Sequence, residues 1–130
     1  MAKYIIKNRY TDKIIVAMEA ERFRDVVEAH KMSLRDASLS KIDIWGADLK
    51  HANLEGADLR GSYFRSCDLR EANLRKTDLR GADFQRADLR NSDMTDVLLD
   101  WTNLRAADLT GVKTNKQDEI LKCLKIVERP

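Results

Sequence analysis

The sequence predicts an all-β solenoid, because three features recur with a period of five over residues 32–111. A large apolar residue occupies every fifth position from Leu34 to Leu109, and the residue two positions before it is mostly small. All five glycines fall two positions after a large residue. A period of five fits neither the 3.6-residue repeat of a helix nor the alternation of a continuous strand. The chain should therefore run as short extended segments separated by corners.

Each unit of the repeat explains one such segment and its corner. In Ala47-Asp48-Leu49 the small and the large residue are two positions apart, so an extended backbone points both to one side. The residue between them points outward, and this outward column is mostly Asp or Asn. Glycine at the corner suits the second central position of a type II turn, where φ is positive. We therefore expect positive φ at Gly61 and Gly81.

The repeat units also carry a family resemblance. They resemble the A(D/N)LxX signature of the pentapeptide repeat proteins at Ala47-Asp48-Leu49, Ala57-Asp58-Leu59, Ala72-Asn73-Leu74 and Ala87-Asp88-Leu89. The resemblance covers 80 of the 130 residues. It implies a right-handed quadrilateral β-helix of about four coils with 20 residues in each, a rod of roughly 19 Å. On this geometry Phe64 and Phe84 stack inside the rod, one coil apart.

An open solenoid exposes strand edges and an apolar cross-section, so we expect a cap at each end. Residues 1–31 predict an N-terminal cap, with a β-hairpin followed by an amphipathic helix over about residues 20–31. Residues 112–130 predict a C-terminal helix that begins near Asn115 and carries Val127 on its apolar face.

The last coil departs from the repeat beside this C-terminal helix. Leu98 replaces the outward Asp or Asn, and Trp101 occupies a corner where glycine is usual. We expect both to form an apolar seam with Ile120, Leu121 and Leu124. The helix then either folds over its own coil or docks against a second copy. Members of the family that the repeats resemble commonly pair through this end, which favours a homodimer.

Trp45, Tyr63 and Arg65 form a second candidate interaction site. The repeat places all three on one outward side, with Arg65 one coil beyond Trp45 and within cation–π reach. Exposed aromatic residues beside arginine are typical of interface hot spots. The alternative is that the N-terminal cap covers Trp45.

The balance of basic and acidic residues argues against two classes of function. The chain has 24 Lys and Arg against 22 Asp and Glu, and residues 32–111 carry 12 basic and 14 acidic groups. This balance argues against direct nucleic-acid binding. The family resemblance also implies an alternative, a DNA mimic that binds DNA gyrase or a related topoisomerase and confers quinolone resistance. Such a mimic needs a continuous negative field, which a nearly neutral rod does not supply.

We expect no catalysis and no cofactor. The histidines, His30 and His51, have no nucleophile at a catalytic spacing. We therefore place His30 on the buried face of the cap helix and His51 at a solvated corner. A column of stacked aspartates could hold calcium, but a parallel basic column favours a ladder that neutralises itself. The two columns are Asp48, Asp68, Asp88 and Asp108, and Lys50, Arg70 and Arg90.

The leading hypothesis is a non-enzymatic interaction module that presents the faces of a β-helix to a protein partner. Cys67 and Cys123 have no disulfide or metal spacing, which suits a reducing compartment. No signal peptide is evident, and the longest apolar run, residues 14–18, is too short to span a bilayer. A cytoplasmic location without membrane attachment is therefore the expectation.

Overall fold

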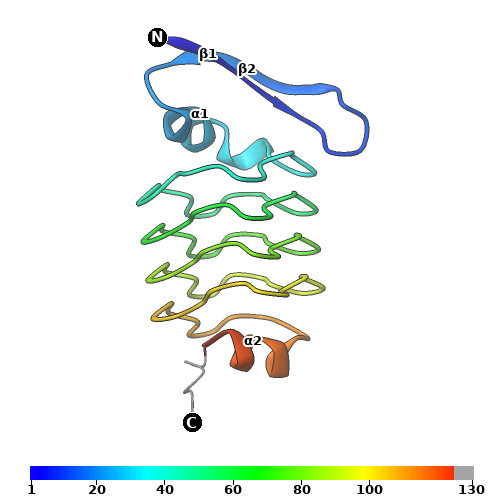
Figure 1. Ribbon diagram of the computed structural model, residues 1–130, viewed down its shortest axis with the longest axis vertical. Helices are drawn as coiled ribbons and strands as arrows, with labels where there is room; N and C mark the ends of the chain where they lie inside the picture. Colours follow the sequence, from blue (N-terminus) through cyan, green and yellow to red (C-terminus); the bar gives the residue numbers. More distant parts are fainter. Residues whose placement is uncertain (125–130) are drawn as a thin grey trace.

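The chain winds into stacked four-sided coils with a cap at each end (Figure 1). The structure, a computed structural model, describes residues 1–124. Its regular elements are β1 (Ala2–Lys7), β2 (Ile14–Ala20), α1 (Phe23–Ala29), a 3-10 helix (Lys31–Ser33) and α2 (Gln117–Leu124). Within residues 1–124, no helix is long and apolar enough to cross a lipid bilayer.

Parallel β-bridges between residues 20 positions apart hold the coils together, as in Asp48–Asp68 and Asp68–Asp88. The backbone N–H of Asp68 donates to Ala47 O at 3.0 Å, and that of Leu49 donates to Asp68 O at 2.8 Å. These bridges are isolated, because a corner follows after every five residues and leaves no room for a longer strand. The solenoid is thus a ladder of single bridges.

Every corner of the solenoid adopts a left-handed backbone conformation. The residues at every fifth position from Asp36 to Gly111 have φ between 57° and 71°. Gly61 and Gly81, with φ of 64° and 70°, confirm the prediction made for them. At most corners the N–H of the next residue donates to the carbonyl three positions back, as a type II turn requires. Lys41 and Trp101 share this conformation, so the corner does not require glycine.

The large apolar column fills the inside of the rod. Phe64 and Phe84 stack as predicted, with ring centroids 4.8 Å apart and planes 6° from parallel. The small Ser62 and Ala82 next to them are also fully buried. Burying each large side chain contributes roughly 1.5–3 kcal/mol, so this column supplies most of the stability. Leu109, in the last coil, is only partly buried.

The N-terminal cap closes the first coil partly with backbone. β1 and β2 pair antiparallel, as the sequence predicts. The carbonyl of Lys7, at the end of β1, accepts from Ser38 N–H at 2.8 Å, and that of Lys31 accepts from Asn53 N–H at 2.8 Å. Two sides of the first coil thus receive the hydrogen bonds that a preceding coil would give.

Helix α1 serves the other two sides with its side chains. Glu28 Oε2 accepts from the Asp48 N–H at 2.7 Å, and Arg24 Nη1 donates to Trp45 O at 3.0 Å. The helix is shorter than the predicted span of residues 20–31, because the chain tightens into the 3-10 helix after His30. Val26 and Val27 are fully buried on its inner face.

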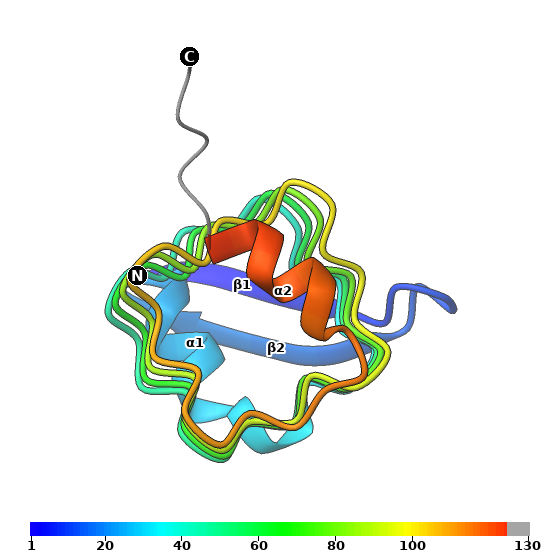
Figure 2. The same ribbon diagram turned by 90° about the horizontal axis from the view of Figure 1, so that it is seen from below.

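Helix α2 lies across the other end of the rod (Figure 2). Ile120 is buried, and Cys123 and Leu124 are half-buried against the core. The carbonyl of Cys123 accepts from Leu104 N–H at 3.4 Å. Val127, predicted on the same face, lies outside the described residues.

We predict that Gly81→Val lowers the free energy of unfolding by about 1–2 kcal/mol, because a β-branched residue is strained at positive φ. A Cβ at Gly81 would meet only backbone atoms of Gly61 at 3.9–4.0 Å, so space is not the cause. Gly81→Ala is the matched control and should cost less, since Ala106 already holds φ of 58°. Thermal melts followed by circular dichroism measure both; an unchanged melting temperature for the valine variant would contradict strain at this corner.

Candidate functional site

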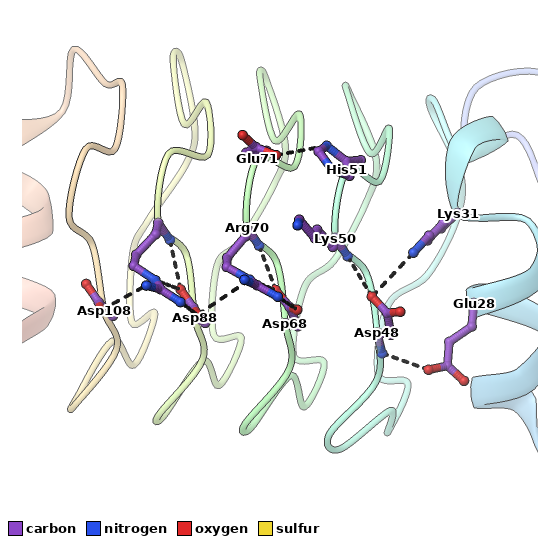
Figure 3. A network of polar contacts seen from close by, with 11 residues as sticks. Glu28, Lys31, Asp48, Lys50, His51, Asp68, Arg70, Glu71, Asp88 and Asp108 are labelled. Carbon is purple, nitrogen blue, oxygen red and sulfur yellow. Dashed lines mark hydrogen bonds and ion pairs between the residues drawn. The ribbon is translucent and has the colours of Figure 1, made fainter.

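One outward side of the rod carries alternating acidic and basic groups (Figure 3). Arg70 donates to both oxygens of Asp68, from Nε at 2.9 Å and Nη2 at 2.7 Å, and its Nε lies 3.8 Å from Asp88. Arg90 repeats the arrangement between Asp88 and Asp108. At the N-terminal end Lys31 contacts Asp48 at 3.3 Å. Each carboxylate on this side is therefore offset by a cation.

The opposite side, two corners away, repeats the pairing with buried carboxylates. Asp58 and Asp78 are almost fully buried and receive two hydrogen bonds each from the guanidinium groups of Arg60 and Arg80. These hydrogen bonds hold the pKa of both carboxyl groups below the ordinary value for Asp. The Oδ1 atom of each aspartate also accepts the backbone N–H two residues on. This local bond explains why the outward column prefers Asp and Asn.

The stacked aspartates are thus partners of cations in this structure. Among residues 1–124, no three His, Cys, Asp or Glu side chains gather as a group that could hold a metal ion. The Cys67 thiol is buried, donates to Ile44 O at 3.2 Å, and has its pKa raised by burial to about 11. It is a core residue. His51 occupies a corner, where Nδ1 lies 3.1 Å from a carboxylate oxygen of Glu71.

The predicted aromatic patch is exposed on the side of the rod next to the ladder of Figure 3. Trp45 is 61% exposed and Tyr63 is 49% exposed. Arg24 of the N-terminal cap donates a hydrogen bond to the carbonyl oxygen of Trp45, and most of the Trp45 indole stays open to solvent. The alternative that the cap covers Trp45 is therefore wrong.

Arg65 lies in the patch but does not stack on the indole. Its Nε donates to Asp83 Oδ2 at 2.6 Å, one coil further along the rod. The cation–π contact that the described residues form is between Arg9 and Tyr10, at 5.0 Å. The prediction of a contact between Arg65 and Trp45 is wrong, because a carboxylate attracts the guanidinium more strongly than an exposed ring does.

Asp43 belongs to the patch, although the sequence interpretation missed it. It pairs with Tyr63 in a parallel bridge, and its Oδ1 accepts the backbone N–H of Trp45 at 3.3 Å. Together with Arg65 these residues line a surface cleft of about 260 Å³. The signal that could have found Asp43 is its neighbour two positions on, which is Trp rather than a basic residue.

The C-terminal candidates separate into a buried and an exposed group. Ile120 is buried and Leu124 is half-buried on the face of α2 that packs against the last coil, as a capping helix requires. Leu98 and Leu121 are about half exposed, and Trp101 is 93% exposed. Within one chain these five residues therefore do not pack together as a seam. The outward column and the corner direct Leu98 and Trp101 away from the open end that α2 covers.

A groove of about 430 Å³ lies along one edge of the contact between the last coil and α2. Trp101 and Arg105 border it from the coil, and Glu119, Lys122 and Cys123 border it from the helix. The exposed indole of Trp101 therefore stands at the edge of a cleft rather than inside a packed seam.

Comparison with known proteins agrees with this architecture. The sequence profile of the pentapeptide repeats matches eight copies, at residues 33–65, 58–96 and 72–111. The chain belongs to the pentapeptide repeat family. Among curated protein sequences, none is similar enough to count as a relative.

Solved structures of pentapeptide repeat proteins include similar coils. HetL of the cyanobacterium Nostoc sp. strain PCC 7120, involved in heterocyst differentiation regulation, is 33% identical over 58% of this chain, with a TM-score of 0.57. QnrB1, a plasmid-mediated fluoroquinolone resistance protein, is 23% identical over 68% of this chain, with a TM-score of 0.56. The chain spans 35% of the length of HetL and 45% of that of QnrB1. The second likeness concerns the fold alone.

We predict that stability falls as the pH drops below about 4. A carboxyl group whose pKa is lower in the folded state stabilises the fold above its unfolded pKa, and that contribution is lost as pH falls through the folded pKa. Asp78→Asn keeps an oxygen for the Arg80 N–H but removes the ion pair with its guanidinium. Its melting temperature should be lower at pH 7 and should depend less on pH between about 5 and 2.

Asp108→Asn is the matched control for this experiment. Its carboxylate is half exposed and lies 3.8 Å from Arg90, so the substitution should change both the melting temperature and its pH dependence less. Equal pH profiles for the wild type and Asp78→Asn would show that the buried pairs do not set the acid limit.

Proposed function

We propose that the protein is a non-enzymatic interaction module that docks a protein partner on the surface formed by Asp43, Trp45, Tyr63 and Arg65. The observation that carries the proposal is the exposure of two aromatic rings in adjacent coils, where they line a cleft together with a carboxylate and a guanidinium group. Aromatic residues supply much of the binding energy in protein interfaces. The cleft between them gives a partner side chain a place to enter.

The charge pattern disfavours the alternative of a DNA mimic. On two sides of the rod the carboxylates lie against Arg60, Arg70, Arg80 and Arg90, at 2.6–2.8 Å. A surface of neutralised pairs does not supply the continuous negative field that a protein reading DNA charge would recognise. A DNA gyrase supercoiling assay with and without the protein separates the two functions, and we expect no inhibition.

The likeness to HetL is compatible with this function, since HetL is involved in the regulation of heterocyst differentiation. The shared coils cover about a third of HetL, so the likeness supports the type of role and not a particular partner.

We predict that the double variant Trp45→Ala/Tyr63→Ala loses its protein partner. Each aromatic truncation at an interface centre costs about 2 kcal/mol or more, so retention should fall by well over tenfold. The measurement is affinity capture from a lysate with quantitative mass spectrometry. Trp101→Ala is the matched control, because it removes an exposed indole at the opposite end of the rod. A set of captured proteins that is the same for all three forms would contradict the proposal.

A homodimer through the C-terminal end is a second proposal. It rests on Leu98, Trp101 and Leu121, which expose apolar surface around α2. Apolar side chains that α2 does not cover could be buried by a second copy, provided that the contact is isologous.

We predict that the chain sediments at twice its mass and that Trp101→Ser/Leu121→Asp returns it to a monomer. Both side chains are exposed, so the substitutions leave the capping contacts of Ile120 intact. Circular dichroism should show unchanged melting of the monomeric variant at high dilution. A wild-type chain that sediments as a monomer at high concentration would exclude the dimer, and the capping role of α2 would remain.

A further inference from the structure

We propose that Asp43, Trp45 and Tyr63 form a receptor for an arginine side chain of the partner protein. This inference rests on the proposed docking function and specifies its chemistry. The partner would insert one guanidinium group between the two rings and pair it with the Asp43 carboxylate.

The outward aspartates of the solenoid give the first reason. Nearly all of them lie within 3.8 Å of a basic nitrogen: Asp48, Asp58, Asp68, Asp78, Asp83, Asp88, Asp93 and Asp108. Asp43 is the member of this column that has no such contact among the residues the structure describes. One cation is thus missing from a pattern that the rest of the column follows.

The sequence explains why the cation is missing. Asp58 and Asp78 receive theirs from the arginine two positions on, and the corresponding position after Asp43 is Trp45. Arg65 could reach the site from the next coil, but Asp83 holds its guanidinium at 2.6 Å. The pairing demand of Asp43 is left for a group from outside the chain.

The geometry of the cleft suits a planar cation. Asp43 and Tyr63 are bridge partners in adjacent coils, so their side chains project outward next to each other. The Asp43 Oδ1 atom accepts the Trp45 N–H, which holds the carboxylate at the mouth of the cleft. Guanidinium groups stack on aromatic faces and bind carboxylates through two parallel hydrogen bonds. Arginine meets both conditions better than lysine, whose ammonium is a compact point charge.

The other charges around the cleft do not take the place of this cation. Arg24, beside the Trp45 carbonyl, lies 3.5 Å from Glu28 within α1, and Arg65 is paired with Asp83. Lys41 lies at the preceding corner, where its Cγ would be 3.6 Å from a Cβ on Gly61. Asp43 therefore remains the carboxylate that an incoming guanidinium meets at the rings.

The test is a titration of the full-length protein with an acetylated and amidated Gly-Arg-Gly peptide. The indole N–H signal of Trp45, assigned with Trp45→Phe, should shift and saturate in ¹H–¹⁵N spectra. The same peptide with citrulline, which is neutral and of equal shape, should give no saturable shift. The lysine peptide should bind several-fold more weakly than the arginine peptide.

Two variants that the repeat itself tolerates sharpen the test. Asp43→Asn should weaken peptide binding about tenfold, because it removes the charge and keeps the oxygen that accepts the Trp45 N–H. Asn53 and Asn73 occupy the same position of the five-residue repeat, so the variant should fold normally. Trp45→Arg supplies an internal cation and should abolish binding. Asp108→Asn is the control and should bind like the wild type.

The outcomes distinguish this inference from the proposed function. Absence of a saturable shift, equal binding of the citrulline peptide, or binding unaffected by Asp43→Asn would overturn the arginine receptor. If captured partners still depend on Trp45 and Tyr63 in that case, the docking function stands without it. If neither experiment depends on the two rings, both proposals fail together.

Discussion

The structure depends on one backbone constraint, a left-handed conformation at every fifth residue. It turns the chain a quarter of the way around the rod, so that four corners bring residue i beside residue i+20. Backbone hydrogen bonds between coils, such as Leu49 N–H to Asp68 O at 2.8 Å, can form only when all four corners are closed. Non-glycine residues adopt this conformation at some cost in energy, and the bonds between coils compensate for it. The corners and the ladder are therefore interdependent.

The surface follows from the same geometry. A period of 20 places outward residues in straight columns, about one strand spacing apart. In such a column like charges would repel. The arginines two positions after Asp58, Asp68 and Asp88 also lie 3.8 Å from the carboxylate of the next coil, as Arg70 does between Asp68 and Asp88. The repeat thus stacks carboxylates on one another and also supplies the arginines that offset their charge. Where another residue replaces the arginine, as Trp45 does after Asp43, the carboxylate loses this partner and an aromatic ring lies beside it.

Sequence reasoning succeeded where position alone decides the outcome. The stacking of Phe64 and Phe84 follows from a period of 20 and an inward direction, because the interior offers each side chain one place. It failed where side chains choose among partners. Arg65 can reach either an indole or a carboxylate, and the sequence does not show that Asp83 lies closer. The repeat placed Leu98 in the outward column and Trp101 at a corner, but it did not show whether α2 packs on them, because the position of α2 over the last coil depends on contacts absent from the repeat.

The stacking of coils also fixes how the length of the rod relates to the direction of its surfaces. Insertion or loss of 20 residues would lengthen or shorten the rod while every column keeps its azimuth, because one complete coil is added or removed. A change of five residues would instead rotate everything beyond it by a quarter turn about the axis. The aromatic patch in the first coils and the groove beside α2 would then face different directions relative to each other. Since the coils share a continuous core, the rod fixes both the separation and the mutual angle of these two surfaces.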